Sequence, residues 1–510
     1  MNKSHAEHIT IKKSGMTIDD VLAVVRGNAT ISIDEEVINS LTQTRTLIES
    51  LSNSDQPVYG VSTGFGALAN RHINPELRTQ LQKSLIRSHA AGLGQPVEVE
   101  VVRALMLLRL KTLCSGRTGV RPVIVTTLAA MLNARITPVV REFGSLGCSG
   151  DLAPLAHCAL ALMGEGEVVD SSGAMFRAAD ALFANGIESV ELREKEGLAL
   201  INGTDGMLGM LIMAIDDLEM LCDTADLTAA MSVEALLGTD QVFLPELHAP
   251  LRPHPGQAVS AANMLKALSG SGIVASHRVN DSKVQDAYSL RCAPQVTGAV
   301  RDTVAHARLV AERELASTID NPVVLEDGRI SSNGNFHGAP IAYVLDFLAI
   351  AVADLGSISE RRTDRLLDKN RSHGLPPFLA DDAGVDSGLM IAQYTQASLV
   401  SENKRLASPA SVDSIPSSAM QEDHVSMGWN AARKLRQALT NLASILGIEY
   451  VSAARAIDFR APLQPAAVTR SAIEILRTVV PGPGPDRYLS PELAAGVELV
   501  KNGSLATLMK

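Results

Sequence analysis

The sequence is poor in aromatic residues and in cysteine. Only 3% of its 510 residues are aromatic, with a single tryptophan, and five residues are cysteine. Because the five cysteines include no CxxC pair, neither a disulfide framework nor a zinc knuckle is indicated, and a reducing cytoplasm fits best. The first residues, MNKSHAEHITIKKSG, contain no apolar core of a secretion signal, which argues against export.

Positive charge and the common cofactor motifs are also scarce. The 45 basic and 56 acidic side chains leave a formal net charge of −11, so we expect no nucleic-acid partner. The sequence has no GxxxxGK phosphate loop, no HExxH zinc helix and no GxGxxG after a clear strand, which leaves nucleotide chemistry without support. No cluster of His, Cys, Asp and Glu has metal-ligand spacing, so we expect no metal.

The most apolar stretch is not free of charge. Residues 338–357 read GAPIAYVLDFLAIAVADLGS and include Asp346 and Asp354. Each aspartate would cost about 2.5–3.5 kcal/mol near the centre of a bilayer. The apolar residues recur at helical spacing on more than one side. We therefore expect a helix buried in protein rather than a membrane span, continuing to Gly374.

Long segments with helical patterning dominate the rest of the chain. Further helices are predicted at 207–238, 298–318, 389–407 and 423–457. Their length, without alternation of strand and helix, predicts a mostly α fold, an elongated central bundle of long helices with a more irregular N-terminal region. Soft boundaries near 200 and 480 divide the chain into an N-terminal region (1–200), the central bundle (201–480) and a C-terminal helical tail (481–510).

One generic catalytic signature does occur. Residues 60–64, GVSTG, match the GxSxG nucleophile elbow, with Ser62 as the nucleophile. That elbow requires a strand before the serine and a helix after it, whereas Pro57 interrupts the approach and Gly66 follows. A serine hydrolase is therefore a remote alternative, and a glycine loop is the favoured interpretation.

A second segment delivers small residues to the start of a predicted helix. It reads GSLGCSGDLAPLAHCALAL from Gly144. Asp151 suits the N-cap of this helix, and Pro154 is tolerated in the first turn, where its missing N–H would be unpaired. The helix start would direct positive partial charge at Ser149. Taken alone, the pattern is typical of an ordinary turn and cap.

Seven blocks spread over the chain change that interpretation. They are YGVSTGFG at Tyr59, SHAAGLG at Ser88, GSLGCSGDLAPLAH at Gly144, NGTDGM at Asn202, VQDAYSLRCAPQV at Val284, GNFHG at Gly334 and QEDHVSM at Gln421. In this order the blocks resemble the histidine branch of the aromatic amino acid ammonia-lyases, and the resemblance covers nearly the whole chain.

The resemblance implies a cofactor made from the chain itself, with none bound from solution. In this family a three-residue segment cyclises to 4-methylideneimidazole-5-one (MIO), which captures the substrate amine and makes it a better leaving group. Here the segment is Cys148, Ser149 and Gly150. The nitrogen of Gly150 would attack the carbonyl carbon of Cys148, and Ser149 would lose water. Most members of the family have alanine at the position of Cys148. The side chain at this position stays outside the ring, so a cysteine should permit cyclisation.

The resemblance also implies roles around the MIO. Tyr59 is the candidate base, and nearby helix N-termini would have to favour its phenolate, because a free tyrosine titrates near about 10. Arg291 would clamp the substrate carboxylate. Asn202 and Tyr288 would lie beside the MIO, Tyr288 in a catalytic role. The remaining expected pocket residues are His89, Gln285, Phe336 and Glu422.

Glu422 discriminates best between substrates. A carboxylate suits an imidazole N–H, whereas lyases for phenylalanine and tyrosine carry glutamine at this place. Met420 stands where many members have asparagine, which affects affinity or substrate range rather than the chemistry. The resemblance therefore implies conversion of L-histidine to trans-urocanate and ammonia, the entry step of histidine degradation.

The resemblance further implies a homotetramer whose active sites draw residues from three subunits. Tyr59, Ser149 and Glu422 would then meet across chains. One alternative stays open: another MIO-dependent aromatic amino acid ammonia-lyase, or a 2,3-aminomutase, acting on tyrosine or phenylalanine.

Overall fold

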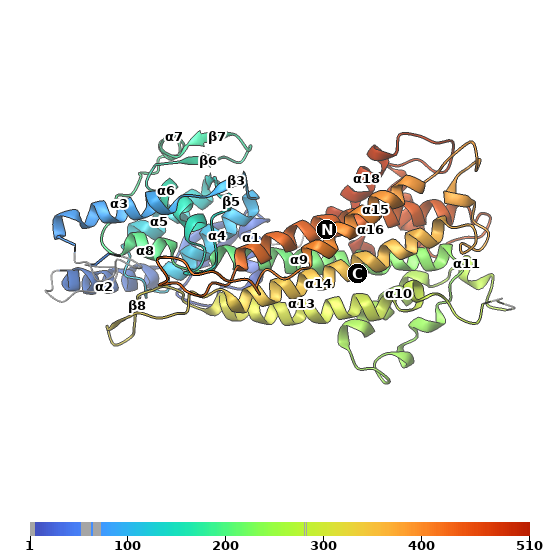
Figure 1. The fold of residues 1–510 in the computed structure, drawn as a ribbon, viewed down its shortest axis with the longest axis horizontal. Coiled ribbons are helices and arrows are strands. Elements are labelled where there is room, and N and C mark those ends of the chain that lie inside the picture. Colours follow the sequence, from blue (N-terminus) through green and yellow to red (C-terminus); the bar gives the residue numbers. More distant parts are fainter. Residues whose placement is uncertain (1–5, 53–62, 65–72, 280, 282) are drawn as a thin grey trace.

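A computed structural model describes residues 6–52, 63–64, 73–279, 281 and 283–510. The protein is elongated, with a broad N-terminal part at one end and long helices running away from it (Figure 1). The mostly helical fold expected from the sequence is confirmed. The helices of the N-terminal part are α1 (Ile18–Val25), α2 (Glu35–Ser52), α3 (Arg78–His89), α4 (Val99–Leu113), α5 (Pro122–Asn133), α6 (Leu152–Leu162), α7 (Ala178–Ala184) and α8 (Glu196–Ile201).

The long helices form the bundle, in which α9 packs against α16 and α13, and α14 packs against α16 and α13. Two short helices, α11 and α12, lie at the end of the bundle far from the N-terminal part. The helices from α9 onward are α9 (Asp205–Ala235), α10 (Pro255–Leu268), α11 (Gly272–Ala275), α12 (Tyr288–Arg291), α13 (Ala293–Ala316), α14 (Ala339–Leu367), α15 (Met390–Leu406), α16 (Gly428–Asp458), α17 (Ala467–Arg477) and α18 (Leu489–Lys501).

The described strands are two to four residues long, so they fasten loops rather than build a core sheet. β1 (His8–Ile11) pairs in parallel with β2 (Thr30–Ile33), and β3 (Leu93–Pro96) pairs antiparallel with β5 (Arg141–Phe143). The other pairings are antiparallel, between β4 (Thr137–Pro138), β6 (Glu167–Val169) and β7 (Met175–Arg177), and between β8 (Val323–Val324) and β9 (Ile330–Ser331).

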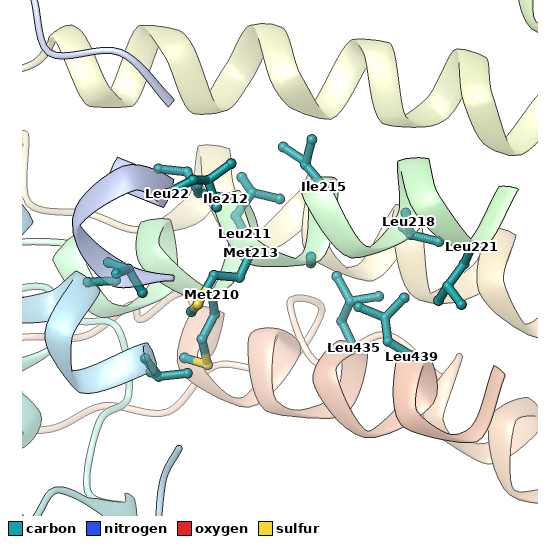
Figure 2. Packing of buried hydrophobic residues seen from close by; sticks show 14 of the residues in the cluster. Leu22, Met210, Leu211, Ile212, Met213, Ile215, Leu218, Leu221, Leu435 and Leu439 are labelled. Carbon is teal, nitrogen blue, oxygen red and sulfur yellow. The ribbon is translucent and has the colours of Figure 1, made fainter. Parts of the chain in front are cut away.

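Helix α9 is apolar around its circumference because other helices surround it. Figure 2 shows Leu22 of α1 on one side of α9, and Leu435 and Leu439 of α16 on the other. A fully buried leucine or isoleucine side chain contributes about 1.5–3 kcal/mol to the free energy of folding. The buried apolar side chains of α9 therefore stabilise its packing against the neighbouring helices. The α9 residues labelled in Figure 2 are Met210, Leu211, Ile212, Met213, Ile215, Leu218 and Leu221.

Three predicted helix ends differ from the observed ones by five residues or more. Helix α13 begins at Ala293 instead of residue 298, because Pro294 is accommodated in its first turn. Helix α14 ends at Leu367 instead of continuing to Gly374, because the Asp368 carboxylate accepts the N–H of Asn370 at 2.8 Å and forms a turn. Helix α16 begins at Gly428 rather than at residue 423, because the preceding loop is bonded to other segments: the N–H of Met427 donates to the Leu146 carbonyl at 2.9 Å.

The apolar stretch lies in α14, as expected. This helix is long and apolar enough by length and composition to cross a membrane, and 61% of its most apolar window is buried inside the protein. Asp346 within it is buried and forms an ion pair with Lys434 at 2.6 Å. The boundaries near 200 and 480 stay predictions.

Candidate active site

The turn that carries Cys148, Ser149 and Gly150 is pressed against the segment before α9. Gly150 has φ +78° and pairs with Gly203 in a short parallel bridge. The N–H of Asp151 donates to the Gly203 carbonyl at 2.7 Å, and a Cβ at Gly150 would lie 2.0 Å from that oxygen. Only glycine fits here, because a side chain would meet the Gly203 backbone and the left-handed φ disfavours other residues.

Asp151 precedes α6, yet its side chain does not cap that helix. Its carboxylate accepts the N–H groups of Gly206 and Met207, each at 2.9 Å, and the Ser145 hydroxyl at 2.9 Å. The predicted N-cap is therefore corrected: the aspartate caps α9 and ties the starts of two helices together. Burial raises the pKa of Asp151 to about 7, although these hydrogen bonds oppose the shift.

Glu422 lies beside the turn in the same chain. The Ser149 hydroxyl donates to Oε1 of Glu422 at 3.5 Å, and the Ser417 hydroxyl donates to Oε2 at 2.9 Å. The expectation that Ser149 and Glu422 meet across chains is therefore wrong. Burial and the nearby Glu422 charge raise the pKa of the Cys148 thiol to about 12, so this cysteine stays protonated and unreactive.

His89 ends α3 at the same end of the molecule. Its Nδ1 lies 2.9 Å from the Leu85 carbonyl, which can only accept, so the neutral ring carries its proton on Nδ1 and leaves Nε2 as an acceptor. Burial lowers the pKa of His89, and the charge of Glu422 opposes that shift. His89 therefore presents a neutral, polar ring close to Glu422.

Asn202 is buried, and the hydrogen bonds of its amide groups can be followed atom by atom. Its side-chain Nδ2 donates to the backbone carbonyl of Asn321 at 2.9 Å, and its backbone carbonyl accepts a hydrogen bond from the Arg109 guanidinium at 2.7 Å. Within the part of the chain that the structure describes, Oδ1 is buried with no hydrogen-bond partner. Leaving such an acceptor unpaired costs about 1–3 kcal/mol, so this oxygen suits a donor that arrives with a ligand.

The sequence analysis did not identify the buried charged groups next to Asn202. Arg109 is buried and lies 3.5 Å from Asp205, and its guanidinium also donates to the Ile319 carbonyl at 2.8 Å. Burial lowers the pKa of neighbouring Lys111 to about 8, with Asp205 opposing. The available signal was the charged residues inside the mostly apolar helix α4, which are Glu100, Arg103, Arg109 and Lys111.

Phe336 lies in the loop between β9 and α14. Its neighbour His337 contacts His424, with Nε2 of His337 3.1 Å from Nδ1 of His424. Gly338 lies against Ser426, since a Cβ there would be 2.8 Å from the serine hydroxyl. The loop of Phe336 is thus brought to the segment that carries Glu422.

Gln285, Tyr288 and Arg291 lie at the opposite end of the bundle. Asp286 accepts the N–H of Thr239 at 2.7 Å just beyond the end of α9, whereas Asp151 caps the start of that helix. Since α9 has 31 residues and rises 1.5 Å per residue, the two groups are about 45 Å apart. The expected position of Tyr288 beside the MIO is therefore not found within one chain.

At that far end the side chains face outward. Tyr288 is 71% exposed, Gln285 is exposed, and the Arg291 guanidinium stacks on the Tyr288 ring at 4.5 Å. Two other predicted residues, Tyr59 and Ser62, lie outside the described residues. Among the residues that are described, no group of three or more His, Cys, Asp or Glu side chains could hold a metal ion.

Comparison with known proteins identifies the family of the chain. The model of the aromatic amino acid lyase family matches residues 16–478. The chain belongs to this family. It is 67% identical to the histidine ammonia-lyase of Streptomyces avermitilis over 98% of both chains.

Among solved structures, the fold is similar to enzymes with different activities. One is a tyrosine aminomutase from Streptomyces globisporus, with a TM-score of 0.93, 38% identity and 98% of both chains covered. Another is the histidine ammonia-lyase of Trypanosoma cruzi, with a TM-score of 0.89, 37% identity, and 98% of this chain and 95% of that one covered. The fold alone therefore does not separate lyase from mutase.

Proposed function

We propose that the protein is a histidine ammonia-lyase, which eliminates ammonia from L-histidine to give trans-urocanate. The observation that carries this proposal is the Glu422 carboxylate, 3.5 Å from Ser149 and partly open to solvent. A carboxylate there binds an imidazole N–H by a charge-assisted hydrogen bond, which the rings of phenylalanine and tyrosine do not offer in the same place. The identity to a named histidine ammonia-lyase supports the same substrate.

The residues present fit an MIO formed from Cys148, Ser149 and Gly150. The left-handed turn at Gly150, its close approach to Gly203 and the unpaired Oδ1 of Asn202 are the features that favour it. When formed, the MIO supplies an electrophile for the substrate amine. The buried thiol of Cys148 takes no part, because it keeps its proton.

The surrounding side chains divide the remaining work. Glu422 accepts the imidazole N–H of the substrate, and His89 offers Nε2 as a second acceptor. Oδ1 of Asn202 accepts a hydrogen bond from the substrate amine. Arg291 binds the substrate carboxylate, and Tyr59 removes the β-proton.

The 45 Å separation makes a second copy of the chain necessary. Tyr288 and Arg291 reach Ser149 only when the far end of one subunit packs against the N-terminal part of another, which is the arrangement of a homotetramer with shared sites. Exposed apolar residues along α14 suit such packing: Tyr343 is 60% exposed, and Phe347 and Ile350 are each 48% exposed. We place the enzyme in the cytoplasm, consistent with its free cysteines.

Complementation between inactive variants tests the shared site. Ser149→Ala and Arg291→Ala chains are each expected to be inactive, and their co-expression is expected to restore part of the activity. In mixed tetramers some sites pair an intact Ser149 with an intact Arg291. Recovery no greater than the two separate variants would contradict sharing.

Product analysis tests the reaction type. L-histidine is expected to give urocanate and free ammonia in equal amounts. The aminomutase alternative, which is raised by the similarity to a tyrosine aminomutase, would act on tyrosine or phenylalanine, give the β-amino acid and release no ammonia. Labelling of Ser62 by an organophosphonate would instead support the remote hydrolase alternative.

A further inference from the structure

Two loops of the candidate site are joined by a pair of histidines. His337 belongs to the loop after β9, and His424 to the loop before α16 that also carries Glu422. Nε2 of His337 lies 3.1 Å from Nδ1 of His424, and the rings stack with centroids 5.2 Å apart at 25°. The contact therefore combines a hydrogen bond with ring packing across 87 residues of sequence.

The hydrogen bond has a defined direction. The N–H of Ala339 donates to Nδ1 of His337 at 3.3 Å, so that nitrogen is an acceptor and the neutral ring carries its proton on Nε2. His337 then donates to Nδ1 of His424, which must be unprotonated at that atom. Burial, with the neighbouring His424 ring, lowers the pKa of His337 and favours the neutral donor.

The loop that carries Glu422 needs support because its backbone is strained. Ser418, Ala419 and Met420 have φ values of +50°, +53° and +67°, which non-glycine residues adopt only when the surroundings hold them. The bridge between Ser417 and Glu422 closes this strained turn, but both of its residues belong to the same loop.

Formation of the MIO removes the other support of Glu422. The Ser149 hydroxyl, which donates to the carboxylate, leaves as water when the segment cyclises. Two side chains then remain beside the carboxylate: the Ser417 hydroxyl donates to Oε2, and the buried Cys148 thiol lies within hydrogen-bonding reach. After Glu422, three hydrogen bonds among the described residues tie the loop to other segments: Met427 bonds to the Leu146 carbonyl, Ser426 bonds to the Gly147 carbonyl, and His424 bonds to His337. The His424 contact is two residues from Glu422, nearer in sequence than the other two.

We propose that the His337–His424 pair is a positioning device that holds Glu422 for recognition of the substrate ring. Neither histidine contacts the reacting atoms in this account. Both act through the placement of Glu422, so the inference rests on the proposed function. Loss of the pair weakens substrate binding more than it slows the chemical step.

Three single variants separate the hydrogen bond from packing. His424→Leu removes the acceptor, His337→Phe keeps a stacking ring but removes the donor, and His424→Asn returns an acceptor oxygen near the place of Nδ1. Losing one hydrogen bond worth about 1 kcal/mol predicts a rise in KM for histidine of about fivefold for the first two variants, with kcat within about twofold. The asparagine variant is expected to stay within about twofold of the wild type in both constants.

A double variant asks whether the pair acts through Glu422. In a Glu422→Gln background, His424→Leu is expected to cause no further rise in KM, because coupled residues are not additive. Near-ultraviolet MIO absorbance and melting temperature are recorded for each variant. If His424→Leu does not fold, the comparison of His337→Phe with His424→Asn decides the question.

The proposal is overturned if His337→Phe leaves KM unchanged, if His424→Asn is as impaired as His424→Leu, or if the effects of His424 and Glu422 add. A wild-type enzyme that does not act on histidine would instead overturn the proposed function. A wild type that acts on histidine with unaffected histidine variants overturns the positioning role alone.

Discussion

Replacing Gly150 by alanine measures how tightly the MIO segment is packed. The backbone there is left-handed, with φ +78°, which costs an alanine about 1–2 kcal/mol. The new Cβ would lie 2.0 Å from the Gly203 carbonyl oxygen, whereas real Cβ contacts do not fall below 3.0 Å. The two segments must therefore separate by about 1 Å.

That separation lengthens a hydrogen bond as well. The N–H of Asp151 lies 2.7 Å from the same Gly203 oxygen, and moving it by about 1 Å loses a bond worth about 0.5–1.5 kcal/mol. Together with the backbone cost, the Gly150→Ala variant should be destabilised by about 1.5–3.5 kcal/mol. We expect the displaced turn to cyclise poorly, because ring closure requires the nitrogen of residue 150 to reach the Cys148 carbonyl carbon.

A matched glycine isolates the packing effect. Gly173 has φ +81° with nothing within 4 Å of an added Cβ, so Gly173→Ala bears only the backbone cost. Mass spectrometry measures the loss of two waters that accompanies MIO formation, and urea unfolding measures the free energy of unfolding. We expect Gly150→Ala to lack the mass loss and to be less stable than Gly173→Ala. A Gly150→Ala enzyme that forms the MIO and matches Gly173→Ala in stability would refute the reasoning.

Other consequences follow from the charged groups. Glu422→Gln should lower kcat/KM for histidine about tenfold to a hundredfold, because a charge-assisted hydrogen bond of about 1.5–3 kcal/mol is weakened. The MIO absorbance should persist, and unchanged steady-state kinetics would contradict this prediction. Burial raises the pKa of Asp151 to about 7 from about 3.9 unfolded, so the folded carboxyl keeps its proton while the unfolded one ionises. Wild-type stability relative to Asp151→Asn should therefore fall as pH rises from about 4 to 7, by up to about 4 kcal/mol in urea unfolding, and a pH-independent difference would be inconsistent with this account. Arg362→Met leaves Glu449 buried without the cation that lies 2.5 Å away, and should cost about 3–5 kcal/mol in the same assay. Arg329→Met, which removes an ion pair with Asp327 that is exposed on both sides, should cost less than about 1 kcal/mol, and equal losses would argue against this reasoning.

The helical fold could be predicted because its signal is local. The apolar pattern of α9 or α14 depends only on neighbouring residues, and both helices were located to within a few residues except at the end of α14. The start of α16 was misplaced because residues 423–427 are bonded to residues far away in sequence, including Leu146. Helical spacing carries no information about such bonds.

The candidate site was predictable in composition but not in arrangement. Motifs led to Ser149 and Glu422, and the structure brings these two together in one chain, where the sequence suggested a meeting across chains. Asp151 looked like a cap for the helix that follows it, yet it caps α9, whose start lies more than fifty residues later. Which segments meet depends on the tertiary fold, and which copies meet depends on assembly.

The central claim is that the carboxylate of Glu422 selects the substrate ring. Its most direct test is kcat/KM of the wild-type enzyme for L-histidine, L-tyrosine and L-phenylalanine, with urocanate, coumarate and cinnamate measured as the respective products. A charge-assisted bond of about 1.5–3 kcal/mol predicts that histidine is preferred by at least about tenfold. A preference for tyrosine or phenylalanine would contradict the account.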